Sequence, residues 1–245
     1  MPRKTTWREP NHRLALVRFG DDTAYFQNRG DTCFVSNLPI IAGQYGKTGK
    51  KGVYYEVTIR EMKGDGTIAL GMQCLPYPPH RLPGWHRKSA ALHLDDRRIY
   101  FDNSEGGSDY MDETVDEKSG KLSKRHCTPH IRPNDTLGCG YEFNNGLGKM
   151  FYTYNGQRLA TAFNRIFDPQ ENDADIQSVD GDPKMDVFAA IGVTDGPCQF
   201  DVNFGQHKFK WEGGPSDVGY WSVEQWNVKG LFNRLSTDEP PRYGI

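Results

Sequence analysis

The sequence predicts an all-β protein, an antiparallel β-sandwich with short flanking helical or irregular segments. From about residue 24 to residue 211, short runs rich in Val, Ile, Phe, Tyr and Thr recur, and each ends at Gly, Pro, Asn or Asp. Aromatic residues make up 12% of the chain, beside 27 glycines and 15 prolines, a composition typical of strands joined by tight turns. No segment of useful length before residue 215 shows the helical period.

The clearest predicted strand covers residues 53–59. Its odd-numbered residues are apolar or aromatic and share one face, so the period of two predicts a strand with one buried face. Asn155-Gly156 and similar turns supply the positive φ angles of two-residue hairpins. The same pattern predicts further strands over residues 67–72, 90–94, 99–101, 136–143, 149–153, 187–193 and 199–204.

Two segments interrupt this rhythm, and two more follow the last predicted strand. Residues 102–133 are polar and charged, and residues 168–184 are rich in Asp, so both are predicted to be long surface loops or insertions. Residues 222–235 carry Trp, Val, Leu and Phe at loosely helical spacing, although Gly230 weakens a helix there. Residues 236–245 contain two prolines and are predicted to form an exposed extended tail.

Composition excludes several function classes. The net charge is −2, with 30 Lys and Arg against 32 Asp and Glu, so we expect neither a nucleic acid nor an anionic membrane as partner. No apolar run approaches the roughly 20 residues that span a bilayer, and the N-terminus lacks a secretory signal, so we expect an intracellular, cytoplasmic chain. The five cysteines are scattered and odd in number, which predicts buried thiols instead of a disulfide framework.

Six motifs occur in a fixed order along the chain. They are Gly52-Val53-Tyr54-Tyr55-Glu56-Val57, Ile68-Ala69-Leu70-Gly71-Met72, Arg81-Leu82-Pro83-Gly84-Trp85, Asp135-Thr136-Leu137-Gly138-Cys139-Gly140, Phe151-Tyr152-Thr153-Tyr154-Asn155-Gly156 and Val202-Asn203-Phe204-Gly205-Gln206. Together they resemble a SPRY domain over residues 24–211. The Leu-Pro-Gly-Trp loop and the closing Asn-Phe-Gly-Gln are most similar to the subgroup around Ran-binding protein M and the fungal SPRY-bearing ubiquitin-ligase adaptors of endosome and vacuole. Residues 1–23 then form an N-terminal flank, 212–235 a Trp-rich extension and 236–245 the tail.

The resemblance implies a bent, concanavalin-like sandwich without a catalytic centre, whose edge loops bind a short peptide of a partner protein. One departure from the family is Ala90-Ala91-Leu92-His93, where the family has an aromatic pair. Because of this departure and the two longer insertions, the ligand preference of the family does not transfer to this chain. By matching motif positions, the peptide site is expected to comprise Asn37, Leu38, Pro39, Tyr77, Arg81, Leu82, Trp85, Thr194, Asp195 and Gly196.

Two aromatic residues of this site allow different interpretations. Trp85 is either an anchor for a bound peptide or a side chain that folds back and holds its own loop. Tyr77 stands among Pro76, Pro78 and Pro79, and prolines lower the entropy lost on binding, so it is the better candidate for a preorganised contact.

The tail contains a second interaction motif. Pro240, Pro241 and Tyr243 match Pro-Pro-x-Tyr, the ligand of WW domains, and the alternative is a chance Pro-rich tail. In the fungal adaptors that the chain resembles, such motifs recruit WW-containing HECT ubiquitin ligases, which would place this chain on endosomal or vacuolar membranes through its partners. Those adaptors carry a membrane-spanning segment upstream, so the chain is expected to be either a soluble relative or a fragment.

Catalytic and metal-binding patterns are incomplete. His126, Cys127, His130 and Cys139 have irregular spacing for zinc, and the Asp-rich stretch 173–182 lacks the order of a calcium loop. Gly43 to Thr48 is too short for a phosphate loop, and His86 and His93 with Asp95 and Asp96 lack a nucleophile. We therefore expect no metal, no cofactor and no enzymatic activity.

Three functions remain to be compared. The first is an adaptor that binds a client peptide and recruits a WW-domain ubiquitin ligase. The second is a scaffold subunit of a larger ligase assembly like Ran-binding protein M, with an incidental tail motif. The third and most distant is a carbohydrate or small-molecule binder, for which no convincing carboxylate pair is present. The sequence names neither the client nor the oligomeric state.

Overall fold

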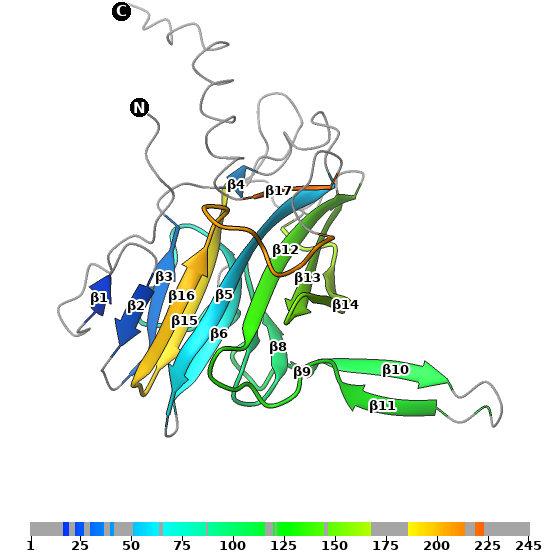
Figure 1. Cartoon of the computed structure of the whole chain (residues 1–245), viewed down its shortest axis with the longest axis horizontal. Helices are drawn as coiled ribbons and strands as arrows, with labels where there is room; N and C mark the ends of the chain where they lie inside the picture. Colours follow the sequence, from blue (N-terminus) through cyan, green and yellow to red (C-terminus); the bar gives the residue numbers. More distant parts are fainter. Residues whose placement is uncertain are drawn as a thin grey trace, which may run out of the picture.

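The computed structural model describes residues 17–19, 23–26, 30–36, 40–41, 51–63, 66–86, 88–115, 120, 122–144, 147–167, 186–213 and 219–222. Every regular element within these residues is a β-strand. The strands form two large sheets that face each other and a two-stranded sheet that projects from one end (Figure 1). The all-β sandwich predicted from the period-two pattern is confirmed.

The larger sheet has the order β1-β2-β16-β5-β12-β13-β14, and β17 lies beside β5. All its pairs are antiparallel except β17 with β5. Its strands are β1 (Val17–Phe19), β2 (Thr23–Phe26), β5 (Gly52–Met62), β12 (Thr136–Asn144), β13 (Leu147–Tyr154), β14 (Gln157–Asn164), β16 (Cys198–Asn203) and β17 (Tyr220–Ser222).

The smaller sheet has the order β3-β15-β6-β7-β8-β9, and β4 pairs with β15. Because its central strands β6 and β15 are distant in sequence, the sheet forms only when the two halves of the domain meet. Its strands are β3 (Thr32–Val35), β4 (Ile40–Ile41), β6 (Thr67–Cys74), β7 (Ser89–His93), β8 (Arg98–Phe101), β9 (Ser108–Asp109) and β15 (Asp186–Thr194).

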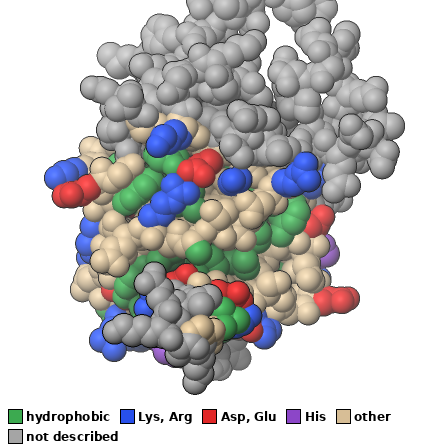
Figure 2. Space-filling view, turned by 90° about the vertical axis from the view of Figure 1, so that its right-hand side faces the viewer, with side chains coloured by type: hydrophobic (Ala, Val, Ile, Leu, Met, Phe, Trp, Pro, Cys, Tyr) green, Lys and Arg blue, Asp and Glu red, His purple; other side chains and the backbone are tan. Residues whose placement is uncertain are grey.

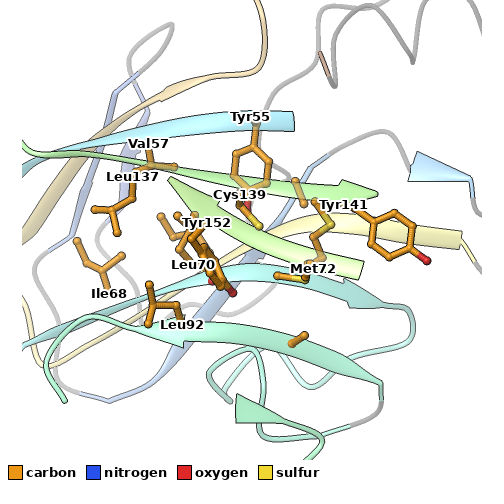
Figure 3. Packing of buried hydrophobic residues seen from close by; sticks show 14 of the residues in the cluster. Tyr55, Val57, Ile68, Leu70, Met72, Leu92, Leu137, Cys139, Tyr141 and Tyr152 are labelled. Atoms are coloured by element: carbon orange, nitrogen blue, oxygen red, sulfur yellow. The ribbon is translucent and has the colours of Figure 1, made fainter. Parts of the chain in front are cut away.

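The main core lies between the two sheets (Figure 3). Side chains of β5 and β12, such as Val57 and Leu137, face those of β6 and β7, such as Ile68 and Leu92. Two buried tyrosines of the larger sheet donate to carbonyls of the smaller sheet, which satisfies their hydroxyl groups. The donor oxygens lie 2.5 Å from the Gly71 carbonyl for Tyr55 and 3.1 Å from the Leu70 carbonyl for Tyr152.

The strand predicted over residues 53–59 is correct, but the prediction that only one of its faces is buried is wrong. Tyr54 is 0% and Glu56 is 4% exposed on the face that points away from the core. A segment some 150 residues later in the chain covers this face, and the Trp211 ring lies 4.9 Å from the Tyr54 ring between centroids. Strand periodicity reports the alternation of side chains, but it does not report which distant segment covers the second face.

The covering segment is fixed by one carboxylate. Glu56 accepts hydrogen bonds from the backbone amides of Lys210 (2.9 Å) and Trp211 (3.0 Å) and from the Tyr54 hydroxyl (2.8 Å). A buried carboxylate is stable only when such donors replace water. We call the contact of Glu56 with residues 210–211 the carboxylate clamp, and it explains why a glutamate lies in the middle of a buried strand.

The loop predicted over residues 102–133 is wrong in part. Within it, β9 extends the smaller sheet, and β10 (Met111–Val115) pairs with β11 (Leu122–His126) to form a projecting hairpin that we call the arm (Figure 1). Cross-strand ion pairs such as Arg125 with Asp112 (3.3 Å) join its strands. The arm lacks an apolar face, so the hydrophobic pattern gave no sign of it. The second predicted loop, residues 168–184, lies outside the described residues.

The turn predicted at Asn155-Gly156 is confirmed, with φ of 48° and 84°. It connects β13 to β14, an edge strand that the sequence analysis missed because most of its residues are exposed. Ser222, predicted to begin a late helix, instead ends β17, and residues 223–235 lie outside the described residues.

Candidate functional site

The Pro-rich loop between β6 and β7 crosses the outer face of the smaller sheet. Its residue Leu82 is 1% exposed and packs against Ala69 and Ala91. Both alanines alternate with core residues along their strands, so they belong to the face turned away from the core. Burial of one leucine contributes about 1.5–3 kcal/mol. The side chain of Leu82 therefore holds the loop on the sheet.

Small residues under the loop make this approach possible. A Cβ atom at Gly192 of β15 would lie 2.4 Å from Cδ of Pro83, so any larger residue there would displace the loop. Farther along, the amide of Cys33 on β3 donates to the Pro79 carbonyl at 2.9 Å. The loop thus packs on β15 and is hydrogen-bonded through its backbone to the edge strand β3.

Trp85 lies at the end of this loop and packs on a row of rings. Its ring is 5.7 Å from that of His93 between centroids, and His93 stacks on Tyr100 at 4.1 Å. The ring of Trp85 therefore folds back onto the sheet, as one of its two interpretations predicts. Its buried indole Nε1, however, has no hydrogen-bond partner among the residues that the structure describes.

Tyr77 and Arg81 lie on the same loop but differ in exposure. Tyr77 is half-buried, its hydroxyl donates to the Leu82 carbonyl at 2.5 Å, and burial raises its pKa to about 12. Arg81 is exposed. Tyr77 therefore fixes the shape of the loop, and the guanidinium of Arg81 is accessible to solvent.

The turn of Thr194, Asp195 and Gly196 begins at the last residue of β15. Asp195 has a φ of 47°, and its Oδ1 accepts the amide of Gly30 at 3.1 Å. Thr194 pairs with Thr67 at the start of β6. The turn is therefore connected to β6 through Thr67, and through Gly30 to the residues that precede β3.

The structure brings part of the predicted site together. Leu82 and Pro83 cover Gly192, which precedes Thr194 by two residues, so the loop and the turn lie at the same end of the smaller sheet. We call this end, with Tyr77, Arg81, Leu82, Trp85 and residues 194–196, the loop site. Six further predicted residues lie outside the described residues, namely Asn37, Leu38, Pro39, Pro240, Pro241 and Tyr243.

The structure gives a physical reason for Ala90-Ala91-Leu92-His93, the segment that departs from the aromatic pair of the family. Ala91 leaves the space that Leu82 fills, and His93 forms a hydrogen bond with the Pro83 carbonyl through Nε2 (3.0 Å). Sequence reasoning missed this supporting role of His93. The available signal was a polar residue placed on the outer face of a predicted strand.

His93 also bears on the general-base alternative. Burial lowers its pKa, against the opposing effect of the Pro83 carbonyl. Asp96 accepts the hydroxyl of Tyr100 at 2.6 Å, and Asp95 accepts that of Thr67 at 2.5 Å. All these groups have structural partners within the fold.

The candidate metal ligands are placed in different surroundings. Cys139 is 0% exposed in the main core, while His126 and Cys127 lie at the base of the arm. No group of three His, Cys, Asp or Glu with metal-binding geometry occurs within the described part of the chain. All five cysteines are free thiols, as predicted, and burial raises the pKa of Cys198 to about 12 and of Cys127 to about 11.

Comparison with known proteins identifies the family behind this fold. A model of the SPRY domain family matches residues 52–171. The chain carries a SPRY domain. This confirms the resemblance drawn from the six motifs, and SPRY domains are in general protein-interaction modules. The wider boundaries of 24 and 211 stay a prediction.

Curated relatives also contain this domain. The chain is 25% identical over 238 residues to "Protein ssh4" of Sclerotinia sclerotiorum, which covers 96% of this chain and 35% of that protein. It is 28% identical over 146 residues to human SPRY domain-containing protein 3, covering 58% of this chain and 27% of that protein. The chain thus spans about a third of the length of these relatives.

A solved structure supports the fold assignment. The crystal structure of a human SPRY domain matches with a TM-score of 0.51 and 22% sequence identity, covering 78% of this chain and 97% of that one. Among the residues placed in the structure, no helix is long and apolar enough to cross a bilayer.

Proposed function

We propose that this chain is a non-enzymatic adaptor that binds a peptide segment of a client through the loop site of its SPRY domain. Its second interaction is recruitment of a WW-containing HECT ubiquitin ligase through Pro240, Pro241 and Tyr243. The two sites together raise the concentration of the ligase around the client, without any bond being made or broken by this chain.

The observation that carries the peptide half is the unpartnered indole N–H of Trp85 in a loop held at several points. A buried donor without a partner costs about 1–3 kcal/mol, and a carbonyl of a bound peptide would remove that cost. The fixed backbone of the loop also lowers the entropy lost on binding. Arg81, Thr194, Asp195 and Gly196 are the further polar contacts of the peptide in this proposal, while Leu82 and Tyr77 hold the loop.

The peptide half is tested by panning a phage-displayed library of random dodecapeptides on the native chain and measuring the affinity of enriched peptides by calorimetry. We expect Trp85→Phe, which keeps a ring and removes the N–H, to weaken binding about fivefold or more, equivalent to about 1 kcal/mol. Thermal unfolding of the free variant should change little, because the N–H has no described partner to lose. Equal affinity of the native chain and Trp85→Phe would contradict this role.

The ligase half is tested by calorimetry of the full chain with isolated WW domains of a HECT ligase. We expect micromolar affinity, about −8 kcal/mol or weaker, and its loss in Tyr243→Ala, because the WW groove binds the tyrosine after a polyproline II segment. Arg242→Ala is the matched control, since the third position of the motif is free, and it should bind like the native chain. If no WW domain binds the native tail, the scaffold function with an incidental motif replaces the adaptor.

A further inference from the structure

A cavity of about 790 Å³ lies where the arm joins the larger sheet. It is lined by Arg97 from the turn between β7 and β8, by Asp112 on β10, by residues 125–129 at the end of β11 and by residues 154 and 157–160 at β13 and β14. We call it the arm pocket. The arm pocket shares no residue with the loop site. The peptide contacts proposed above therefore assign no role to this pocket.

The arm pocket collects buried polar atoms that have no partner. Within the described part of the chain, four buried side-chain nitrogen or oxygen atoms lack a hydrogen-bond partner. Three of them, Nε of Arg97, Nδ1 of His126 and Oγ1 of Thr128, belong to residues that line this one cavity. Thr128 is only 1% exposed. Such a concentration of unsatisfied groups points to a ligand that supplies polar atoms.

The charge of the lining favours an anion. Three arginines contribute to it, and Asp112 is the single acidic residue in the lining. Arg158 is paired with Glu142 (2.8 Å) and Arg125 with Asp112 (3.3 Å), whereas no described residue forms an ion pair with Arg97. Figure 2, which looks onto the side from which the arm projects, shows basic side chains with acidic ones among them above a band of hydrophobic side chains. Guanidinium groups bind carboxylates and phosphates with charge-assisted, often paired hydrogen bonds.

The size of the cavity and its position favour an extended chain over a single ion. Its volume lies in the range of pockets that hold drug-sized ligands, far above that of one phosphate. One wall is β14, which among the described strands pairs only with β13, so no described strand pairs with its second edge. An extended peptide can add backbone hydrogen bonds to such an edge.

We propose that the arm pocket is a second binding site, which takes an extended peptide bearing a phosphate or carboxylate group. The anionic group lies against Arg97, His126 and Thr128, and the peptide backbone follows β14 below the arm. Arg158 is held by its contacts with Glu142 and Tyr220 and lines the pocket from β14.

The test titrates the native full chain with two fluorescent hexapeptides, one with a central phosphoserine between glycines and serines and one of six glutamates, with inorganic phosphate alone as a third probe. We expect at least one peptide to bind, more tightly than inorganic phosphate, and binding should weaken as NaCl rises from 50 to 300 mM because the contacts are ionic. The peptide that binds better distinguishes a phosphate from a carboxylate ligand.

Two variants locate the site. Arg97→Gln, which removes the guanidinium without an ion pair, should weaken the bound peptide at least tenfold. Thr128→Val should weaken it several-fold while leaving the thermal stability of the free chain equal or higher, because a buried hydroxyl without a partner is replaced by a methyl group. Lys51→Gln, the same charge change at an exposed residue outside the pocket, should bind like the native chain.

Three results would overturn the proposal. They are no binding of either peptide by the native chain at millimolar concentration, equal losses in Arg97→Gln and Lys51→Gln, or inorganic phosphate binding as tightly as the peptides. Trp85→Phe separates this site from the loop site, since it should leave binding at the arm pocket unchanged.

Discussion

Single buried polar side chains hold the loops of this sandwich in place. His93 is 3% exposed, stacks on Tyr100 and is hydrogen-bonded to the Pro83 carbonyl, so it connects β7 to the loop above it. Its environment accepts the neutral imidazole more readily than the charged one, because burial removes the water that would solvate the charge.

This environment predicts acid sensitivity. The pKa of His93 is lower in the folded chain than its ordinary value of 6.5, so the unfolded chain binds the proton first. The stability contribution is complete above pH 6.5 and declines as the pH falls below it, by up to about 1.4 kcal/mol per pH unit. Urea unfolding between pH 7.5 and 5.5 measures this slope.

Two variants isolate the effect of His93. His93→Gln should be less stable than the native chain at pH 7.5 and should show a smaller decline toward pH 5.5. His80→Gln, at an exposed position on the Pro-rich loop, should keep the native slope. A native slope in His93→Gln would assign the acid sensitivity to another group.

At the scale of elements, strands with alternating apolar residues were predictable and strands without them were not. The strand over residues 53–59, the strand over 67–72 and the turn at Asn155-Gly156 follow from periodicity and turn chemistry. The arm and β14 carry mostly exposed polar residues, so no hydrophobic pattern marks them. They form because neighbouring strands offer hydrogen bonds and cross-strand charges, which a local window of sequence does not contain.

The carboxylate clamp connects β5 to the segment after β16, and it gives a prediction at this scale. Glu56→Gln keeps the size of the side chain but replaces one acceptor oxygen by a donor, so the backbone amide of Lys210 or of Trp211 loses its acceptor. We expect a loss of about 1–3 kcal/mol in the free energy of unfolding, measured by urea denaturation.

The matched control is Glu61→Gln on the same strand. Glu61 forms an ion pair with Lys63 whose lysine side chain is 70% exposed, and such surface pairs contribute at most about 1 kcal/mol. Its change in stability should therefore be small. Equal losses in the two variants would show that the clamp contributes no more than an ordinary surface charge.

At the scale of the whole molecule, both sheets are covered on their outer faces. The Pro-rich loop covers the smaller sheet through Leu82 and Pro83, and the segment with Trp211 covers the larger sheet through the carboxylate clamp. The loop site and the arm pocket have no lining residue in common. If both proposed sites bind their ligands, a substitution at one site should leave affinity at the other unchanged.

The sequence by itself determined the all-β class, most core strands, the SPRY family and the order of the loops. These follow from alternation, turn residues and motifs, which are local properties of the chain. Only the tertiary structure decided that Tyr54 and Glu56 are buried, that Trp85 folds back over His93, and that Arg97 meets His126 and Thr128 in one cavity. Such contacts join residues far apart in the sequence, and they depend on how strands pair and which segment covers each face.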